Sequence, residues 1–164
     1  MPNDHNADKI NVEFMKAALK CAEKAFSEGE VPVGAVIVDT AANKIIAQNH
    51  NTREKSKNAL KHAELAVIGE ACRAMGGWRL HMCDIYVTLE PCPMCAGAII
   101  NARLKRVIFG VKDYKAGAFG SVLNLNNFPL NHKPIVIDGI CETESRLLLQ
   151  KFFLELRQKK QKNQ

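Results

Sequence analysis

Short apolar segments of strand length alternate with amphipathic segments of helix length along this chain, and this alternation restricts the fold more than any other feature. The first two apolar segments, residues 33–38 and 44–48, are joined by a short turn, which predicts an antiparallel hairpin. After the hairpin, strands and helices alternate, which predicts βαβ units and a mostly parallel sheet in an α/β fold. Further strands are expected at residues 85–89, 106–110 and 134–138, and helices at residues 12–27, 62–75, 92–102 and from about 142 onward.

We expect one domain over residues 1–164, because this length is typical of a single domain. Hydrophobic residues make up 47% of the chain and charged residues 24%, so the chain can bury a core without disulfide or metal cross-links. Residues 1–10 are expected to form a polar N-terminal tail, and residues 142–162 a C-terminal helix with basic last turns. Residues 50–61 and 113–129 are predicted as loops, the second with at most one helical turn.

Composition and charge also limit the environment and the partners. No apolar run approaches the roughly 20 residues of a membrane span, so we expect no membrane protein. The polar N-terminus predicts no secretory signal, and six cysteines without such a signal favour metal binding in a reducing cytoplasm over a disulfide framework. Lys and Arg number 23 against 17 Asp and Glu, a formal charge of +6 that suggests an anionic partner without identifying it.

Two motifs carry chemistry: His62-Ala63-Glu64 and Pro91-Cys92-Pro93-Met94-Cys95. Cys92 and Cys95 are placed at i and i+3 near a predicted helix start, which puts both thiols on one face and favours their thiolate forms. Two thiolates and the imidazole of His62 supply three ligands of a tetrahedral zinc site and leave the fourth position open.

Glu64 has a defined geometric requirement. Residues two apart on a regular helix point to nearly opposite sides, so His62 and Glu64 share a pocket only if both lie in the first turn of their helix. The predicted helix start at His62 meets this requirement. A carboxylate beside a metal site, and not itself a ligand, is the arrangement of a general acid/base, which favours catalytic over structural zinc.

Two other interpretations of these residues stay open at this point. A lone Cys-x-x-Cys is often a redox pair or simply two cysteines. A structural zinc site needs a fourth ligand, for which the candidates are Cys72, His81, Cys83 and Cys141. The combination of both motifs with their predicted strand, loop and helix context is much more specific than either motif alone.

These residues resemble the zinc-dependent nucleoside deaminase superfamily. Within it, nearly the whole chain is similar to the tRNA-specific adenosine deaminases, and the later matching stretches separate this family from relatives that share only the zinc motif. The matching stretches are residues 29–36, 87–92, 95–99, 109–113, 117–121 and 152–157.

The resemblance implies a three-layer α/β/α cytidine-deaminase-like fold with a five-stranded mixed sheet, a homodimer, and deamination of the wobble adenosine in a tRNA anticodon stem-loop to inosine. It implies that one Zn²⁺ per subunit is bound by His62, Cys92 and Cys95, and that Glu64 transfers protons. By position in the family, Asn51 contacts the target base, and Asp113, Lys115, Phe153 and Arg157 lie in regions that touch the RNA.

The chain departs from the family in one place. Asn58-Ala59-Leu60-Lys61 replaces the usual Asp-Pro-Thr-Ala before His-Ala-Glu, which removes a proline from this loop. Two alternative functions are a zinc-dependent deaminase of a free base or nucleoside, of the guanine or cytidine type, and a non-catalytic zinc protein that binds RNA. The positive charge argues against the first, and the presence of Glu64 argues against the second.

Overall fold

The computed structural model describes residues 4–163, with the strands in the order β2-β1-β3-β4-β5 in one sheet. Strand β1 pairs antiparallel with both β2 and β3, whereas β3 with β4 and β4 with β5 are parallel. The expected hairpin and the mixed five-stranded sheet are therefore confirmed. The strands are β1 (Gly34–Asp39), β2 (Lys44–His50), β3 (Cys83–Leu89), β4 (Arg106–Val111) and β5 (Ile135–Ile137).

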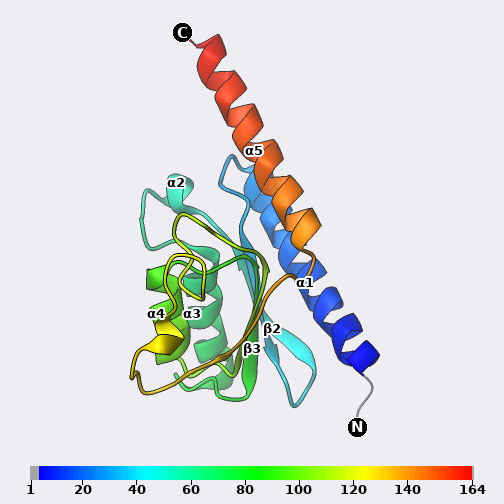
Figure 1. Ribbon diagram of the computed structural model, residues 1–164, viewed down its shortest axis with the longest axis vertical. Coiled ribbons are helices and arrows are strands. Elements are labelled where there is room, and N and C mark those ends of the chain that lie inside the picture. The colour runs from blue at the N-terminus through cyan, green and yellow to red at the C-terminus, as the bar shows by residue number, and fades with distance from the viewer. Residues whose placement is uncertain (1–3, 164) are drawn as a thin grey trace.

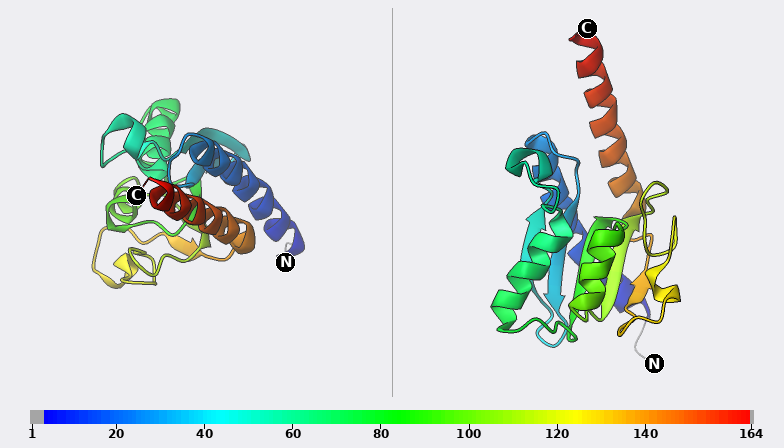
Figure 2. Two further views of the ribbon diagram at one scale, coloured as in Figure 1. Left: turned by 90° about the horizontal axis from the view of Figure 1, so that it is seen from above. Right: turned by 90° about the vertical axis from the view of Figure 1, so that its left-hand side faces the viewer.

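Helices cover both faces of this sheet, which confirms the three-layer α/β/α architecture. α3 (Ala63–Met75) and α4 (Pro93–Asn101) lie on one face, and α1 (Asp4–Ser27) and α5 (Glu142–Lys162) lie on the other (Figures 1 and 2). The second half of α5 extends past the sheet and the other elements (Figure 1). Within the described residues, no helix has both the length and the apolar character that crossing a membrane requires.

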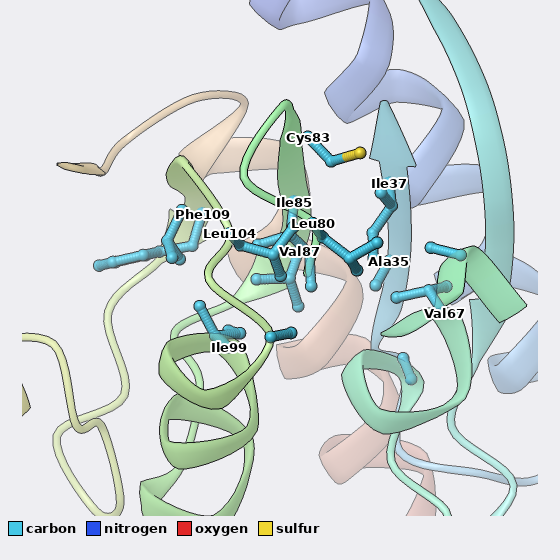
Figure 3. Close-up of a cluster of buried hydrophobic side chains, with 14 of the residues drawn as sticks. Ala35, Ile37, Val67, Leu80, Cys83, Ile85, Val87, Ile99, Leu104 and Phe109 are labelled. Atoms are coloured by element: carbon cyan, nitrogen blue, oxygen red, sulfur yellow. The ribbon is translucent and has the colours of Figure 1, made fainter. Parts of the chain in front are cut away.

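Both faces of the central strands are buried, as expected for strands that read as continuous apolar runs. Along β1, Ala35 and Ile37 belong to the core cluster that packs against α3 and α4, part of which Figure 3 shows. The alternate residues Val36 and Val38 belong to a second cluster, with Met15 of α1. The two-residue period of a strand thus distributes one apolar segment between two layers.

The structure differs from the sequence-based expectation in two short segments. α1 begins at Asp4 instead of residue 12, so residues 4–10, expected in a polar tail, are helical, and residues 1–3 lie outside the described part. No glycine or proline interrupts residues 4–12, so nothing in the sequence ends the helix there. In the loop predicted at 50–61, α2 (Arg53–Ser56) forms a single helical turn, too short to give a periodic pattern. The turn expected within 113–129 is the 3-10 helix η1 (Leu125–Asn127).

The strand directions bring the chemically important segments to one edge of the sheet. Because β2 and β3 both run antiparallel to β1, and β4 runs parallel to β3, the carboxyl ends of β2, β3 and β4 lie at this edge. Ligands of open α/β sheets bind at the carboxyl ends of strands. The loops that leave these ends lead into α3 and α4 and into the segment after β4.

Candidate active site and metal centre

The three expected metal ligands meet at the N-terminal ends of two neighbouring helices. His62 is the N-cap residue of α3 and Cys92 is the N-cap residue of α4, while Cys95 lies buried in the first turn of α4. The Nδ1 atom of His62 is 3.8 Å from Cys92 Sγ and 3.6 Å from Cys95 Sγ. One ligand atom from each residue lies within 4.8 Å of the other two.

This spacing fits a tetrahedral zinc ion. With Zn–S near 2.3 Å and Zn–N near 2.0 Å, tetrahedral angles place sulfur and nitrogen ligands about 3.5 Å apart, close to the two distances observed here. Among the described residues, no fourth His, Cys, Asp or Glu joins this cluster. The four-ligand structural site that Cys72, His81, Cys83 or Cys141 would complete is therefore not formed, and a three-ligand site leaves a position open for chemistry.

Hydrogen bonds within the cluster shift the pKa values of its three ligands in different directions. The Cys95 thiol donates to Cys92, and this bond, with that from His62, lowers the pKa of Cys92 to about 4. The same bond to Cys92, with burial, raises the pKa of Cys95. The hydrogen bond with Cys92 raises the pKa of His62. Cys92 is thus held as the thiolate, which is the form of cysteine that binds metals.

Glu64 lies beside this cluster in the first turn of α3, and its side chain is 4% exposed. Burial raises the pKa of Glu64 to about 7. A carboxyl group with a pKa near neutrality both accepts and releases a proton readily at neutral pH. His62 and Glu64 line the same cavity. Their two-residue spacing allows this because both lie at the start of α3.

The cavity in front of Glu64 has a volume of about 220 Å³. This is below the roughly 300–1,000 Å³ of pockets for drug-sized ligands, which favours a single base as occupant. Residues from four segments line it: Val31 and Val33, then Asn51, Arg53 and residues 62–64, then Leu89, Glu90 and Cys92, and finally Asp113 and Ala116.

Two of the residues assigned to substrate binding lie in this cavity. The Asn51 amide donates to the Val31 carbonyl at 3.2 Å, and its oxygen accepts the Arg53 N–H at 3.1 Å, so Asn51 also holds its own loop. The Asp113 carboxylate accepts the N–H groups of Lys115 and Ala116, at 2.9 and 3.2 Å. The side chains of Asn51 and Asp113 therefore have defined positions in the cavity wall.

The other three assigned residues lie elsewhere. Lys115, Phe153 and Arg157 line a separate hollow of about 360 Å³ between the segment after β4 and α5. Lys112 and Arg146, which carry no role in the sequence-based prediction, line the same hollow. This hollow combines several cations with an aromatic ring that is 41% exposed, a combination suited to phosphates and unstacked bases.

The loop that lacks the family's proline is ordered by Asn58 instead. The Asn58 side-chain oxygen accepts the N–H of Leu60 at 2.9 Å, and its backbone carbonyl accepts the N–H of Lys61 at 3.1 Å. An asparagine whose side chain bonds to the backbone two residues later forms a stable turn. This turn leads directly into His62.

Sequence reasoning missed two buried carboxylates, Glu30 and Glu90, of which Glu90 lines the cavity. Glu30 accepts the backbone N–H groups of Glu54 and Lys55, at 3.1 and 2.6 Å, and so holds the start of α2. Glu90 accepts hydrogen bonds from residues 113–121. Glu30 and Glu90 both belong to stretches that resemble the family. No motif marks their structural role in the sequence, where each is an acidic residue next to an apolar one.

Fold and site together define a class of protein, the deaminases. The sequence profile of the MafB19-like deaminase family matches residues 10–157 of the chain. A tRNA-specific adenosine deaminase of Bacillus subtilis is 49% identical over 148 residues, which cover 90% of this chain and 91% of the relative. A tRNA-specific adenosine deaminase of Rickettsia bellii is 50% identical over 144 residues, which cover 87% and 99%.

A solved structure from a study of A-to-I editing by tRNA:A34 deaminases at the wobble position of transfer RNA superposes with a TM-score of 0.80. It is 43% identical, and the match covers 84% of this chain and 99% of that one. The chain belongs to the family of tRNA-specific adenosine deaminases.

Proposed function

We propose that this protein converts the wobble adenosine of a tRNA anticodon loop to inosine by hydrolytic deamination. The observation that carries this proposal is a buried carboxyl group, Glu64, beside a three-ligand His/Cys/Cys cluster in a cavity sized for one base. The relatives named above supply the substrate, because the cavity alone would also suit other bases.

The cofactor in this proposal is one Zn²⁺ per subunit, bound by His62, Cys92 and Cys95. Zinc at a site with three protein ligands supplies an activated water nucleophile at neutral pH. Thiolate and imidazole ligands are the donors that zinc prefers, whereas Mg²⁺ and Ca²⁺ prefer oxygen ligands.

Glu64 performs the proton transfers. It accepts the proton that the attacking water releases and delivers it to the ring nitrogen beside the carbon that carries the amino group. It then removes the remaining proton from the oxygen now bound to this carbon and delivers it to the amino group. The amino group leaves as ammonia and the carbonyl of inosine forms, so that one water is consumed and one ammonia is released. The walls formed by Asn51 and Asp113 orient the base, which must be turned out of its stack to reach Glu64.

The hollow lined by Lys115, Phe153 and Arg157 binds the RNA outside the cavity. Its cations pair with phosphates, and Phe153 offers a face for a base. The protein acts as a homodimer in the cytoplasm in this proposal. Val122, Phe128 and Leu130 are exposed apolar residues of the segment after β4, and they support a contact with another chain.

The test is inosine formation by the zinc-loaded protein on an anticodon stem-loop with adenosine at the wobble position, with free adenosine, cytidine and guanine assayed in parallel. We expect activity on the stem-loop alone, and a loss of about 10²–10⁴-fold in Glu64→Gln with zinc content unchanged, since this is the contribution of general acid/base groups. Glu70→Gln is the matched control, because Glu70 lies in the same helix but contacts Asn49 outside the cavity.

Two results would contradict the proposal. Deamination of a free base without RNA would assign the protein to the free-base deaminases. Tight binding of the stem-loop by zinc-loaded protein without any deamination would identify a non-catalytic RNA-binding protein. Near-normal turnover in Glu64→Gln would refute the role of Glu64 alone.

A further inference from the structure

A buried carboxylate, Glu90, holds the wall of the cavity that carries Asp113. Glu90 follows β3 and is 2% exposed. Its Oε1 accepts the N–H groups of Phe119 and Ser121, each at 3.1 Å, and its Oε2 accepts the N–H of Asp113 at 3.0 Å. The Ser121 hydroxyl also donates to Oε2. All of these donors belong to one segment, residues 113–121.

Hydrogen bonds, and not an ion pair, compensate the charge of Glu90. In the part of the chain that the structure describes, no Lys, Arg or His forms an ion pair with it. A buried carboxylate is costly unless its oxygens are hydrogen-bonded, and here the 113–121 segment supplies those bonds. The packing is close as well, because a Cβ at Gly117 would lie 2.4 Å from the Glu90 carboxyl carbon.

The same segment is tied to the metal centre. Glu90 is followed directly by Pro91 and Cys92, and the Pro91 carbonyl accepts the N–H of Ala118 at 2.9 Å. Asp113 lies in the cavity wall with Glu64 and Cys92. The position of the Asp113 wall relative to the metal ligands therefore depends on Glu90.

We propose that Glu90 is a positioning residue, which holds the 113–121 segment against Cys92 so that a base placed by this wall lies within reach of Glu64. This inference rests on the proposed function. Affinity for RNA comes mainly from phosphate contacts. Of the four cations in the RNA-binding hollow, only Lys115 belongs to the 113–121 segment, whereas a displacement of about 1 Å at the reacting group costs about 10²-fold in rate. Loss of Glu90 therefore lowers kcat more than it changes KM.

The direct test is Glu90→Gln in the zinc-loaded protein. Glutamine has the same shape, but its amide nitrogen donates where an acceptor is required. We expect kcat on the anticodon stem-loop to fall by about 10²-fold, with KM and zinc content little changed. Hydrogen exchange of the backbone amides in 113–121 should accelerate by at least about tenfold, which is the exchange signature of local opening, while β3 stays protected.

Asp84→Asn is the matched control. Asp84 is 1% exposed in the same strand region, but it pairs with Arg106 near the opposite end of β3, so this variant loses stability without moving the Asp113 wall. Ser121→Ala, which removes a single donor to Glu90, gives a milder perturbation that preserves the fold. It should show a smaller loss of kcat in the same direction, and this result supports the proposal even if Glu90→Gln does not fold.

Unchanged exchange in 113–121 together with unchanged kcat in Glu90→Gln would overturn the inference. So would an equal loss of kcat in Asp84→Asn, because Glu90 would then act only through overall stability. If the wild-type protein forms no inosine, the proposed function fails, but the exchange measurement still decides whether Glu90 holds this wall.

Discussion

Replacement of Gly34 with alanine tests how closely α1 packs on the sheet. A Cβ at this position of β1 would lie 2.1 Å from the carbonyl oxygen of Ala18 and 2.5 Å from the backbone nitrogen of Ala22. Both atoms belong to the backbone of α1, so no side-chain rotation relieves the clash. The helix and the strand must separate by on the order of 1 Å to restore ordinary contact distances.

The expected cost follows from this displacement. Overpacking of a protein core costs typically about 1–3 kcal/mol, and because the obstacle is backbone, we expect a value near the upper limit, about 3 kcal/mol. In a domain of this size each kcal/mol lowers Tm by roughly 2–4 °C. Gly34→Ala should therefore lower Tm by roughly 6–12 °C.

Thermal unfolding of the zinc-loaded protein, followed by circular dichroism and calorimetry, measures this effect. Gly69→Ala is the matched control, because Gly69 lies inside α3 and the nearest atom to an added Cβ is Arg73 Nη1 at 3.8 Å. This second substitution should raise stability by up to about 1 kcal/mol, since alanine is the better helix former. If both variants shift Tm in the same direction, or Gly34→Ala leaves Tm unchanged, α1 does not pack on β1 as described.

Three further predictions concern the metal, the pH and α5. Cys95→Ser should abolish deamination and lower Tm, and so should removal of zinc from the wild-type protein by a chelator. Added zinc should restore activity in the chelated wild type but not in Cys95→Ser, as elemental analysis and deamination assays would show. Burial raises the pKa of Tyr86 to about 12. The folded state thus holds the phenol proton of Tyr86 more tightly than the unfolded state does. The contribution of Tyr86 to the free energy of unfolding is therefore complete below pH 10, and about 2–3 kcal/mol of it is lost between pH 10 and 12. In urea unfolding, the free energy of unfolding should fall less between pH 9 and pH 11.5 in Tyr86→Phe than in the wild-type protein. Phe152 is 9% exposed and its ring centroid lies 5.7 Å from that of Phe26. Phe152→Ala should therefore cost about 3 kcal/mol of stability. Phe153 is exposed, so Phe153→Ala should leave stability nearly unchanged and raise KM for RNA. Equal losses of stability in the two variants would contradict the assignment of Phe152 to the core and Phe153 to the RNA-binding hollow.

The elements that the sequence predicted are those with a strong local pattern. The segments around Ile37 and Ile85 are apolar and bounded by turn residues, so their strands were found with small errors at the ends. The start of α1 was placed too late because residues 4–10 have no apolar period to distinguish a helix from a tail. The single turn of α2 is shorter than one helical repeat of side chains and leaves no pattern at all.

The metal cluster was also accessible from the sequence, because each half of it is local. Cys92 and Cys95 are one helical turn apart, and His62 and Glu64 belong to one helix start, so their chemistry is visible within five residues of chain. The meeting of the two halves required the fold, in which α3 and α4 begin at the same edge of the sheet.

The residues that hold the cavity walls have no such local pattern. Glu90 is bonded to residues as far along the chain as Ser121, and Glu30 to the distant N–H groups of Glu54 and Lys55. Their partners are backbone groups, which every residue type provides, so no side-chain motif marks the other end of these hydrogen bonds. A motif search therefore identifies the groups that we propose to react with the substrate more readily than the groups that we propose to place it. For a carboxylate such as Glu90, burial without a cation partner is the structural sign that the surrounding backbone depends on it.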